Sequence, residues 1–153
     1  MTVRRLALLA IPLAVLVAIV LRYFVYVDRG EGCFITIRPS YVDFNNATMN
    51  RALEILKYAS PADYRNVCTH VGTINPNPSC GGFGGGCFWA HEAQRGGHAT
   101  IDVSTENGAL LWTVAVIVHE TCHAMQFDQR RVMSQDECYR ENDRILRTLV
   151  QFE

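Results

Sequence analysis

Two histidines and a glutamate in the second half of the chain have the spacing of a metal site with a catalytic base. His119, Glu120 and His123 belong to the segment HETCH, which matches the pattern HExxH. On a helix, residues four apart project from the same face, so the two imidazoles can bind one ion. Glu120 lies beside them, where it can accept a proton from a metal-bound water. The pattern therefore indicates a hydrolytic zinc site, and the alternative is a pair of core histidines bonded to backbone carbonyls.

The segments around the motif predict the elements that position it. Residues 109–118 are almost continuously apolar and lead into HETCH, so we expect a helix that is buried on every side. Residues 99–104 alternate and predict a strand just before it. A last helix is expected from about Ser134, with one apolar stripe. The stripe consists of Ile145, Leu149 and Phe152.

The order of strand, buried HExxH helix, short connection and glutamate-bearing helix resembles the zincin metallopeptidases, and small gluzincins (minigluzincins) in particular, over residues 98–151. This resemblance implies an α+β fold in which a small, mainly antiparallel sheet packs on the HExxH helix and a C-terminal helix. It also implies one Zn2+ ion and hydrolysis of peptide bonds in a peptide or protein substrate, with Glu120 as the general base.

The same resemblance implies a third zinc ligand on the helix after the motif. Glu137 matches the ligating glutamate of gluzincins, and Glu141, one turn later, matches the acidic residue that bonds a ligating histidine. Two alternatives stay open. Ser134 and Glu137 also match a capping box, in which Glu137 bonds the Ser134 backbone. Glu141 lies nearer the inward stripe, so it is the alternative ligand.

Other residues are candidates for substrate contacts. His91, His98 and Tyr139 are candidates for the donor that stabilises the oxyanion, although each also suits an ordinary structural role. In zincins the strand before the motif borders the cleft, so residues 99–104 are expected to bind a peptide by strand addition. The glycine-rich residues 81–86 form either a lid beside that cleft or a plain surface turn.

The N-terminal segment predicts a membrane anchor. Residues 6–21 are an unbroken apolar stretch behind the basic start MTVRR, and about 20 apolar residues span a bilayer. We therefore expect residues 1–28 to be a cytoplasmic stub and a transmembrane signal anchor, and residues 29–153 to be an extracytoplasmic domain. A cleaved signal peptide, which would give a secreted protein, is the alternative.

Six cysteines indicate an oxidising compartment, because all of them follow the apolar segment. They allow about 15 pairings, so the connectivity is an expectation from position in the sequence. A set of buried free thiols is the alternative. The pairs that we expect are Cys80–Cys87 around the glycine-rich loop, Cys122–Cys138 between the last two helices, and Cys33–Cys68 between two strand-like segments.

The rest of the chain supplies a modest core and no nucleic-acid signature. Residues 33–38 predict a strand, Asn45 or Asn46 is expected to cap a helix that runs through Tyr58, and a second strand is expected within residues 64–74. The net charge is −1 and no basic run follows the apolar segment, which argues against a nucleic-acid partner.

These patterns together predict a membrane-anchored, extracytoplasmic zinc metalloendopeptidase. An exported zincin-like domain that binds a partner peptide without cutting it is the alternative function. A disulfide-stabilised domain in which HETCH occurs by chance is a third. Glu120 favours the enzyme, because a structural zinc site prefers four protein ligands and has no use for a base.

Overall fold

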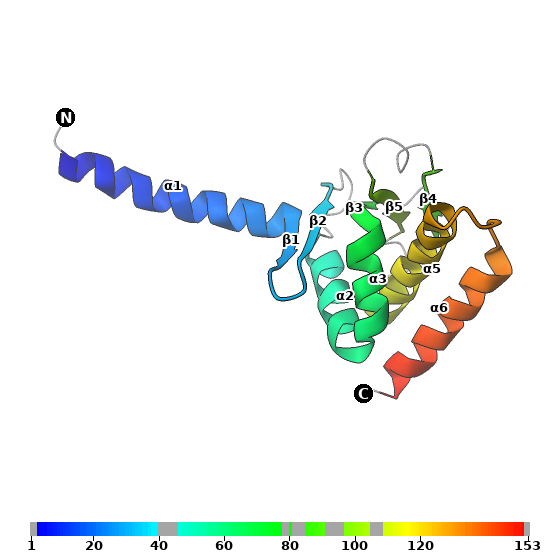
Figure 1. Ribbon diagram of the computed structural model, residues 1–153. Coiled ribbons are helices and arrows are strands. Elements are labelled where there is room, and N and C mark those ends of the chain that lie inside the picture. Colours follow the sequence, from blue (N-terminus) through cyan, green and yellow to red (C-terminus); the bar gives the residue numbers. More distant parts are fainter. Residues whose placement is uncertain are drawn as a thin grey trace.

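The computed structural model describes residues 3–39, 46–77, 80, 85–90, 97–104 and 109–151. Within these residues, five helices accompany one five-stranded sheet (Figure 1). The strands lie in the order β1 (Val25–Asp28), β2 (Cys33–Ile37), β3 (Val71–Pro76), β5 (Ala99–Val103) and β4 (Gly86–Phe88). The helices are α1 (Val3–Phe24), α2 (Asn46–Ala59), α3 (Pro61–His70), α5 (Leu110–Asp128) and α6 (Gln135–Val150).

The sheet is mixed, so the expectation of a mainly antiparallel, zincin-like sheet is wrong. Its centre is parallel, because β2 pairs in parallel with β3 and β3 pairs in parallel with β5. Only the outer strands β1 and β4 pair antiparallel with their neighbours. Parallel neighbours need a long crossover, and α2 and α3 provide it between β2 and β3. The alternation of side chains along a strand predicts its faces but not its direction.

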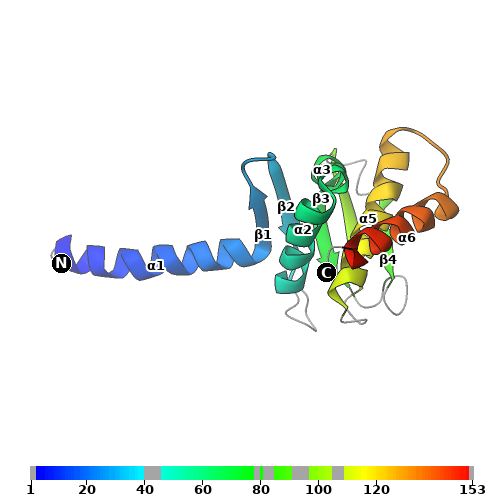
Figure 2. The same ribbon diagram turned by 90° about the horizontal axis from the view of Figure 1, so that it is seen from below.

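The apolar N-terminal run is divided between a helix and a strand. Helix α1 ends at Phe24, and the following residues form β1, in which Tyr26 is buried opposite Ile35 of β2. Within the described part of the chain, no helix has both the length and the apolar character needed to cross a bilayer. This finding corrects the transmembrane helix that was expected within residues 1–28. Helix α1 extends away from the rest of the molecule (Figures 1 and 2).

A helix replaces most of the second expected strand. Pro61 ends α2, as expected, but it also begins α3, because a proline fits the first helical turn without losing a hydrogen bond. Tyr64 and Val67, three residues apart, point one face of α3 into the core. The strand β3 begins only at Val71.

The helices α2, α3 and α5 pack against the sheet and against one another, and α6 packs along α5 (Figures 1 and 2). As expected, α5 is buried through most of its length. Apolar side chains from the sheet and all four of these helices form one core, which holds α5 in place. Its fully buried members include Ile35, Ile37, Leu53, Leu56, Ile74, Ile101, Ile117 and Ile145.

The structure contains three disulfides, and all three expected pairs are confirmed. Cys33–Cys68 joins β2 to α3, and Cys122–Cys138 joins α5 to α6. Cys80–Cys87 closes the segment before β4. No cysteine is left free.

Candidate functional site

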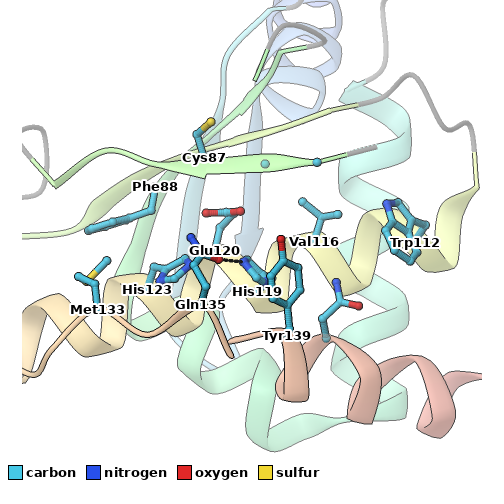
Figure 3. Close-up of a pocket in the computed structure, with 13 residues that line it drawn as sticks. Cys87, Phe88, Trp112, Val116, His119, Glu120, His123, Met133, Gln135 and Tyr139 are labelled. Atoms are coloured by element: carbon cyan, nitrogen blue, oxygen red, sulfur yellow. Dashed lines mark hydrogen bonds between the residues drawn. The ribbon is translucent and has the colours of Figure 1, made fainter. Parts of the chain in front are cut away.

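The HExxH motif lies in the buried second half of α5 and faces a cavity. His119, Glu120 and His123 are only 8%, 3% and 4% exposed, respectively. All three line a cavity of about 600 Å3 between α5, β4 and the first turns of α6 (Figure 3). The wall is otherwise mostly apolar or uncharged, so the histidines and Glu120 are the described lining groups that can titrate near neutral pH. The remaining lining residues are Gly85, Gly86, Cys87, Phe88, Trp112, Val116, Met133, Gln135, Tyr139 and Asn142.

The two imidazoles are neighbours on one face of α5, as the spacing predicts. The ring centroids of His119 and His123 are 5.0 Å apart, with an angle of 78° between the planes. Nε2 of His119 is 3.2 Å from Oε1 of Gln135, and the Tyr139 ring lies 4.7 Å from the His119 ring (Figure 3). Burial and the neighbouring His123 lower the pKa of His119. A neutral imidazole is the form that binds a metal.

His123 has one ring nitrogen bonded and one without a partner. Nδ1 is 3.2 Å from Oε1 of Gln126, while Nε2 is buried and has no hydrogen-bond partner among the residues that the structure describes. Buried polar atoms are almost always paired, so an orphaned ring nitrogen at a cavity wall needs an explanation. A metal ligand is one that fits, since zinc binds an unprotonated imidazole nitrogen.

Glu120 sits in surroundings that favour its protonated form. Burial, together with the charge of Asp102, raises the pKa of Glu120 to about 8. Asp102 is itself buried in β5, where the side-chain amides of Asn75 and Asn77 donate to its two oxygens at 2.9 and 2.7 Å. This network holds a second carboxylate near Glu120, whose pKa thereby comes into the range that suits a general acid or base.

Strand β4 lies directly against the motif at Gly86. A Cβ atom there would stand 2.8 Å from Cγ and Oε1 of Glu120 and 2.7 Å from Cγ1 of Val116. Only glycine allows this close approach. Among the strands that the structure describes, β4 is the outermost on this side of the sheet, next to β5. The expectation that residues 99–104 form the cleft edge is therefore wrong: β5 lies between β3 and β4, and β4 is the edge strand at the cavity.

The structure does not bring the two expected glutamates to the histidines. Glu137 and Glu141 line a different, smaller pocket, in which neither HExxH histidine takes part. The Glu137 carboxylate accepts from Arg131 at 2.7 and 2.9 Å and from Gln126 at 3.1 Å, and Glu141 accepts from Arg144 at 2.7 Å. One of the two hydrogen bonds of the alternative capping box is present: Ser134 Oγ accepts from the Glu137 backbone N–H.

The candidates for an oxyanion donor separate clearly. Tyr139 lines the cavity, whereas His98 is exposed and lies beside Gly72, away from the lining. His91 and residues 81–84 lie outside the described residues. Gly85 and Gly86, the end of the glycine-rich segment, do line the cavity.

Several residues of this site had only weak sequence signals. Gln126 lies one turn after His123 on the same helix face, which was a usable signal. Gln135 follows the cap residue Ser134 and is one turn before Tyr139, so both project from the same side of α6. Asp102 reaches the motif only through the packing of β5 on α5, which no local pattern indicates.

The two imidazoles offer two of the three protein ligands that a catalytic zinc site needs. Among the described residues, no cluster of three or more His, Cys, Asp or Glu side chains is arranged to hold a metal. Gln135 and Tyr139 bring an amide and a phenol oxygen to the same cavity as the histidines. Comparisons with protein-family models, with curated proteins and with solved structures find no match. The function is therefore inferred from the geometry of the site.

Proposed function

We propose that this protein is a zinc-dependent peptidase. The observation that carries the proposal is the pair of buried imidazoles at the wall of a cavity that also contains Glu120, with Nε2 of His123 left without a partner. His119 and His123 would bind the ion, and Gln135 and Tyr139 are the nearest oxygen donors on α6. A bound zinc ion lowers the pKa of a coordinated water to about 7 and polarises a carbonyl oxygen.

Glu120 acts on the proton in this proposal. Its carboxylate would accept a proton from water and hand it to the leaving amine, and a bound cation would favour the charged form that this role needs. Tyr139 would donate to the developing oxyanion from α6.

In this proposal, a peptide substrate binds along strand β4. A peptide that adds to β4 would pair through backbone groups, which do not depend on its side chains. Phe88 and Met133 at one end of the cavity and Trp112 at the other would then offer apolar surface to its side chains (Figure 3).

The three disulfides support an extracytoplasmic location. Such bonds persist in oxidising compartments and are rare in the cytosol. The proposed peptidase would therefore act on exported peptides or proteins.

The test uses the zinc-loaded full chain and a mixture of unstructured peptides. Glu120→Gln is expected to retain zinc and to lower the rate of cleavage by about 10²–10⁴-fold, because only the base is removed. Glu141→Gln is the matched control, since Glu141 bonds Arg144 outside the cavity, and it should cleave as the wild type does. Unchanged cleavage by Glu120→Gln would remove this residue from the mechanism.

A domain that binds a peptide without cutting it is the second candidate function. It is favoured by the lack of a third acidic or thiolate ligand near the histidines within the described residues. Binding of peptides that stay intact, in a chain loaded with zinc, would support this candidate and reject the peptidase.

A further inference from the structure

Gln126 is a fully buried polar residue whose amide is bonded on both sides. It lies on α5 one turn after His123 and is 0% exposed. Its Oε1 accepts from the backbone N–H of Ser134 at 3.0 Å and is 3.2 Å from Nδ1 of His123. Its Nε2 donates to Glu137 Oε2 at 3.1 Å and to the Ser134 carbonyl at 3.4 Å.

These partners fix which end of the amide faces His123. The backbone N–H of Ser134 can only donate, so the atom that meets it must be the amide oxygen. The Glu137 carboxylate and the Ser134 carbonyl can only accept, so the atom that meets them must be the NH2 group. The oxygen of Gln126 therefore points at the imidazole.

The orientation of the amide decides the tautomer of His123. An oxygen acceptor requires that Nδ1 of a neutral imidazole carry the hydrogen, which leaves Nε2 bare. Sγ of Cys138 also lies 3.5 Å from Nδ1, and a disulfide sulfur has no hydrogen to offer, so it agrees with this assignment. The bare Nε2 is the buried atom without a partner at the cavity.

We propose that Gln126 is a positioning residue that holds His123 with Nδ1 protonated and Nε2 free to bind a metal. In this proposal, Glu137 accepts a hydrogen bond from the Gln126 amide and so holds the amide in its orientation. The inference rests on the proposed function for its metal, but the tautomer belongs to the metal-free chain. It gives Glu137 an indirect role: its carboxylate, paired with Arg131, orients the amide and does not reach the ion. Partners of this kind orient ligating histidines and raise their affinity for metal.

The first test measures the tautomer in the metal-free full-length protein. Long-range 1H–15N correlation spectra of the imidazoles should show Nδ1 of His123 protonated and Nε2 unprotonated, the minor tautomer of free histidine. In Gln126→Ala the acceptor is lost, so the Nδ1-protonated form should no longer dominate. Protonated Nε2 in the wild type would overturn the inference.

The second test measures zinc affinity by competition with a chelator. Gln126→Ala should bind zinc about 10–100-fold more weakly than the wild type. Glu137→Ala, in the first turn of α6, should lose less zinc affinity than Gln126→Ala. It replaces Gln126→Ala in this test if that variant does not fold. Gln151→Ala, an exposed glutamine at the end of α6, is the control and should match the wild type.

A rescue variant separates positioning from general destabilisation. Gln126→Glu combined with Glu137→Gln keeps an acceptor for Nδ1 and restores a donor–acceptor pair between α5 and α6. It should keep the wild-type tautomer and most of the zinc affinity. Equal zinc affinity in the wild type and in Gln126→Ala would overturn this inference but not the proposed function. A wild type that binds no zinc would overturn the proposed function. In that case the tautomer measurement alone would decide the role of Gln126.

Discussion

At the scale of single residues, Glu120 has the environment with the clearest consequence for stability. Its pKa is raised from 4.5 to about 8 by burial and by Asp102. The folded chain therefore binds more protons than the unfolded chain between these pH values. The free energy of unfolding of the metal-free protein should fall as the pH rises through this window.

Glu120→Gln should remove that loss, because a neutral amide of the same size does not titrate. Above pH 8 the metal-free variant is expected to be more stable than the wild type by up to about 5 kcal/mol, since one pKa unit corresponds to about 1.4 kcal/mol. Near pH 4.5 the two proteins should be nearly equal. Urea unfolding in the presence of a chelator, followed across this pH range, measures the difference. Parallel stability curves would show that Glu120 is not held in its protonated form.

Alanine substitutions on α6 distinguish direct ligands from more distant residues. Gln135→Ala should change the zinc affinity most, because the Gln135 amide lies 3.2 Å from Nε2 of His119, a proposed ligand. Glu137→Ala should have a smaller effect, through Gln126, and Glu141→Ala should have none. Chelator competition gives the three affinities. A larger change for Glu141→Ala than for Gln135→Ala would contradict the arrangement of α6 described above.

At this scale the sequence predicted the motif but only part of its surroundings. His119 and His123 share a helix face because their spacing is a local property of the backbone. The partner of each ring depends on how α6 is rotated against α5, and the sequence does not fix that rotation. Glu137 was consequently expected at the metal, whereas Gln135 occupies the position beside His119.

At the scale of elements, the contact between β4 and α5 shapes one wall of the cavity. Gly86 lies where a Cβ atom would meet both Glu120 and Val116 at less than 3 Å. The strand is short. It is held in place by its pairing with β5 and by the Cys80–Cys87 disulfide.

Gly86→Ala should push β4 away from α5. Overpacking of this kind costs about 1–3 kcal/mol of stability, and here it should also displace the Glu120 side chain and lower any peptidase activity. Gly30→Ala is the control, because a Cβ there makes only an ordinary contact at 3.4 Å. Urea unfolding of both variants tests the difference. Equal stability of the two variants would mean that β4 does not pack this closely.

The elements themselves were predictable to different degrees. Long periodic segments were predicted well, since α2, α5 and α6 bury one face or all faces along many residues. The strands β2 and β5 also follow from their alternation. The strands β1 and β4 were missed, because one lies in an apolar run and the other beside a glycine-rich segment. Both depend on pairing with a partner strand, which is not a local property.

At the scale of the whole molecule, two of the three disulfides join one helix or strand to another. Cys122–Cys138 fixes α6 against α5 beside the histidines, whereas Cys33–Cys68 fixes β2 against α3, away from the cavity. The two bonds should therefore differ in their effect on the site.

Removal of each bond by paired serine substitutions should cost about 2–5 kcal/mol of stability. Cys122→Ser/Cys138→Ser should also weaken zinc binding, because α6 carries Gln135 and supports Gln126 through Glu137. Cys33→Ser/Cys68→Ser should leave the zinc affinity of the folded protein unchanged. Urea unfolding and chelator competition measure the two effects. Equal zinc affinity in both double variants would mean that zinc binding does not depend on how α6 packs against α5.

The most direct test of the whole account is the metal content of the purified full-length protein after incubation with zinc and removal of the excess. Elemental analysis should find about one zinc per chain in the wild type and in His98→Ala, whose imidazole is exposed outside the cavity. The double variant His119→Ala/His123→Ala should contain almost none. A wild-type protein with less than about a tenth of an equivalent of zinc, or a double variant that retains the metal, would contradict the account.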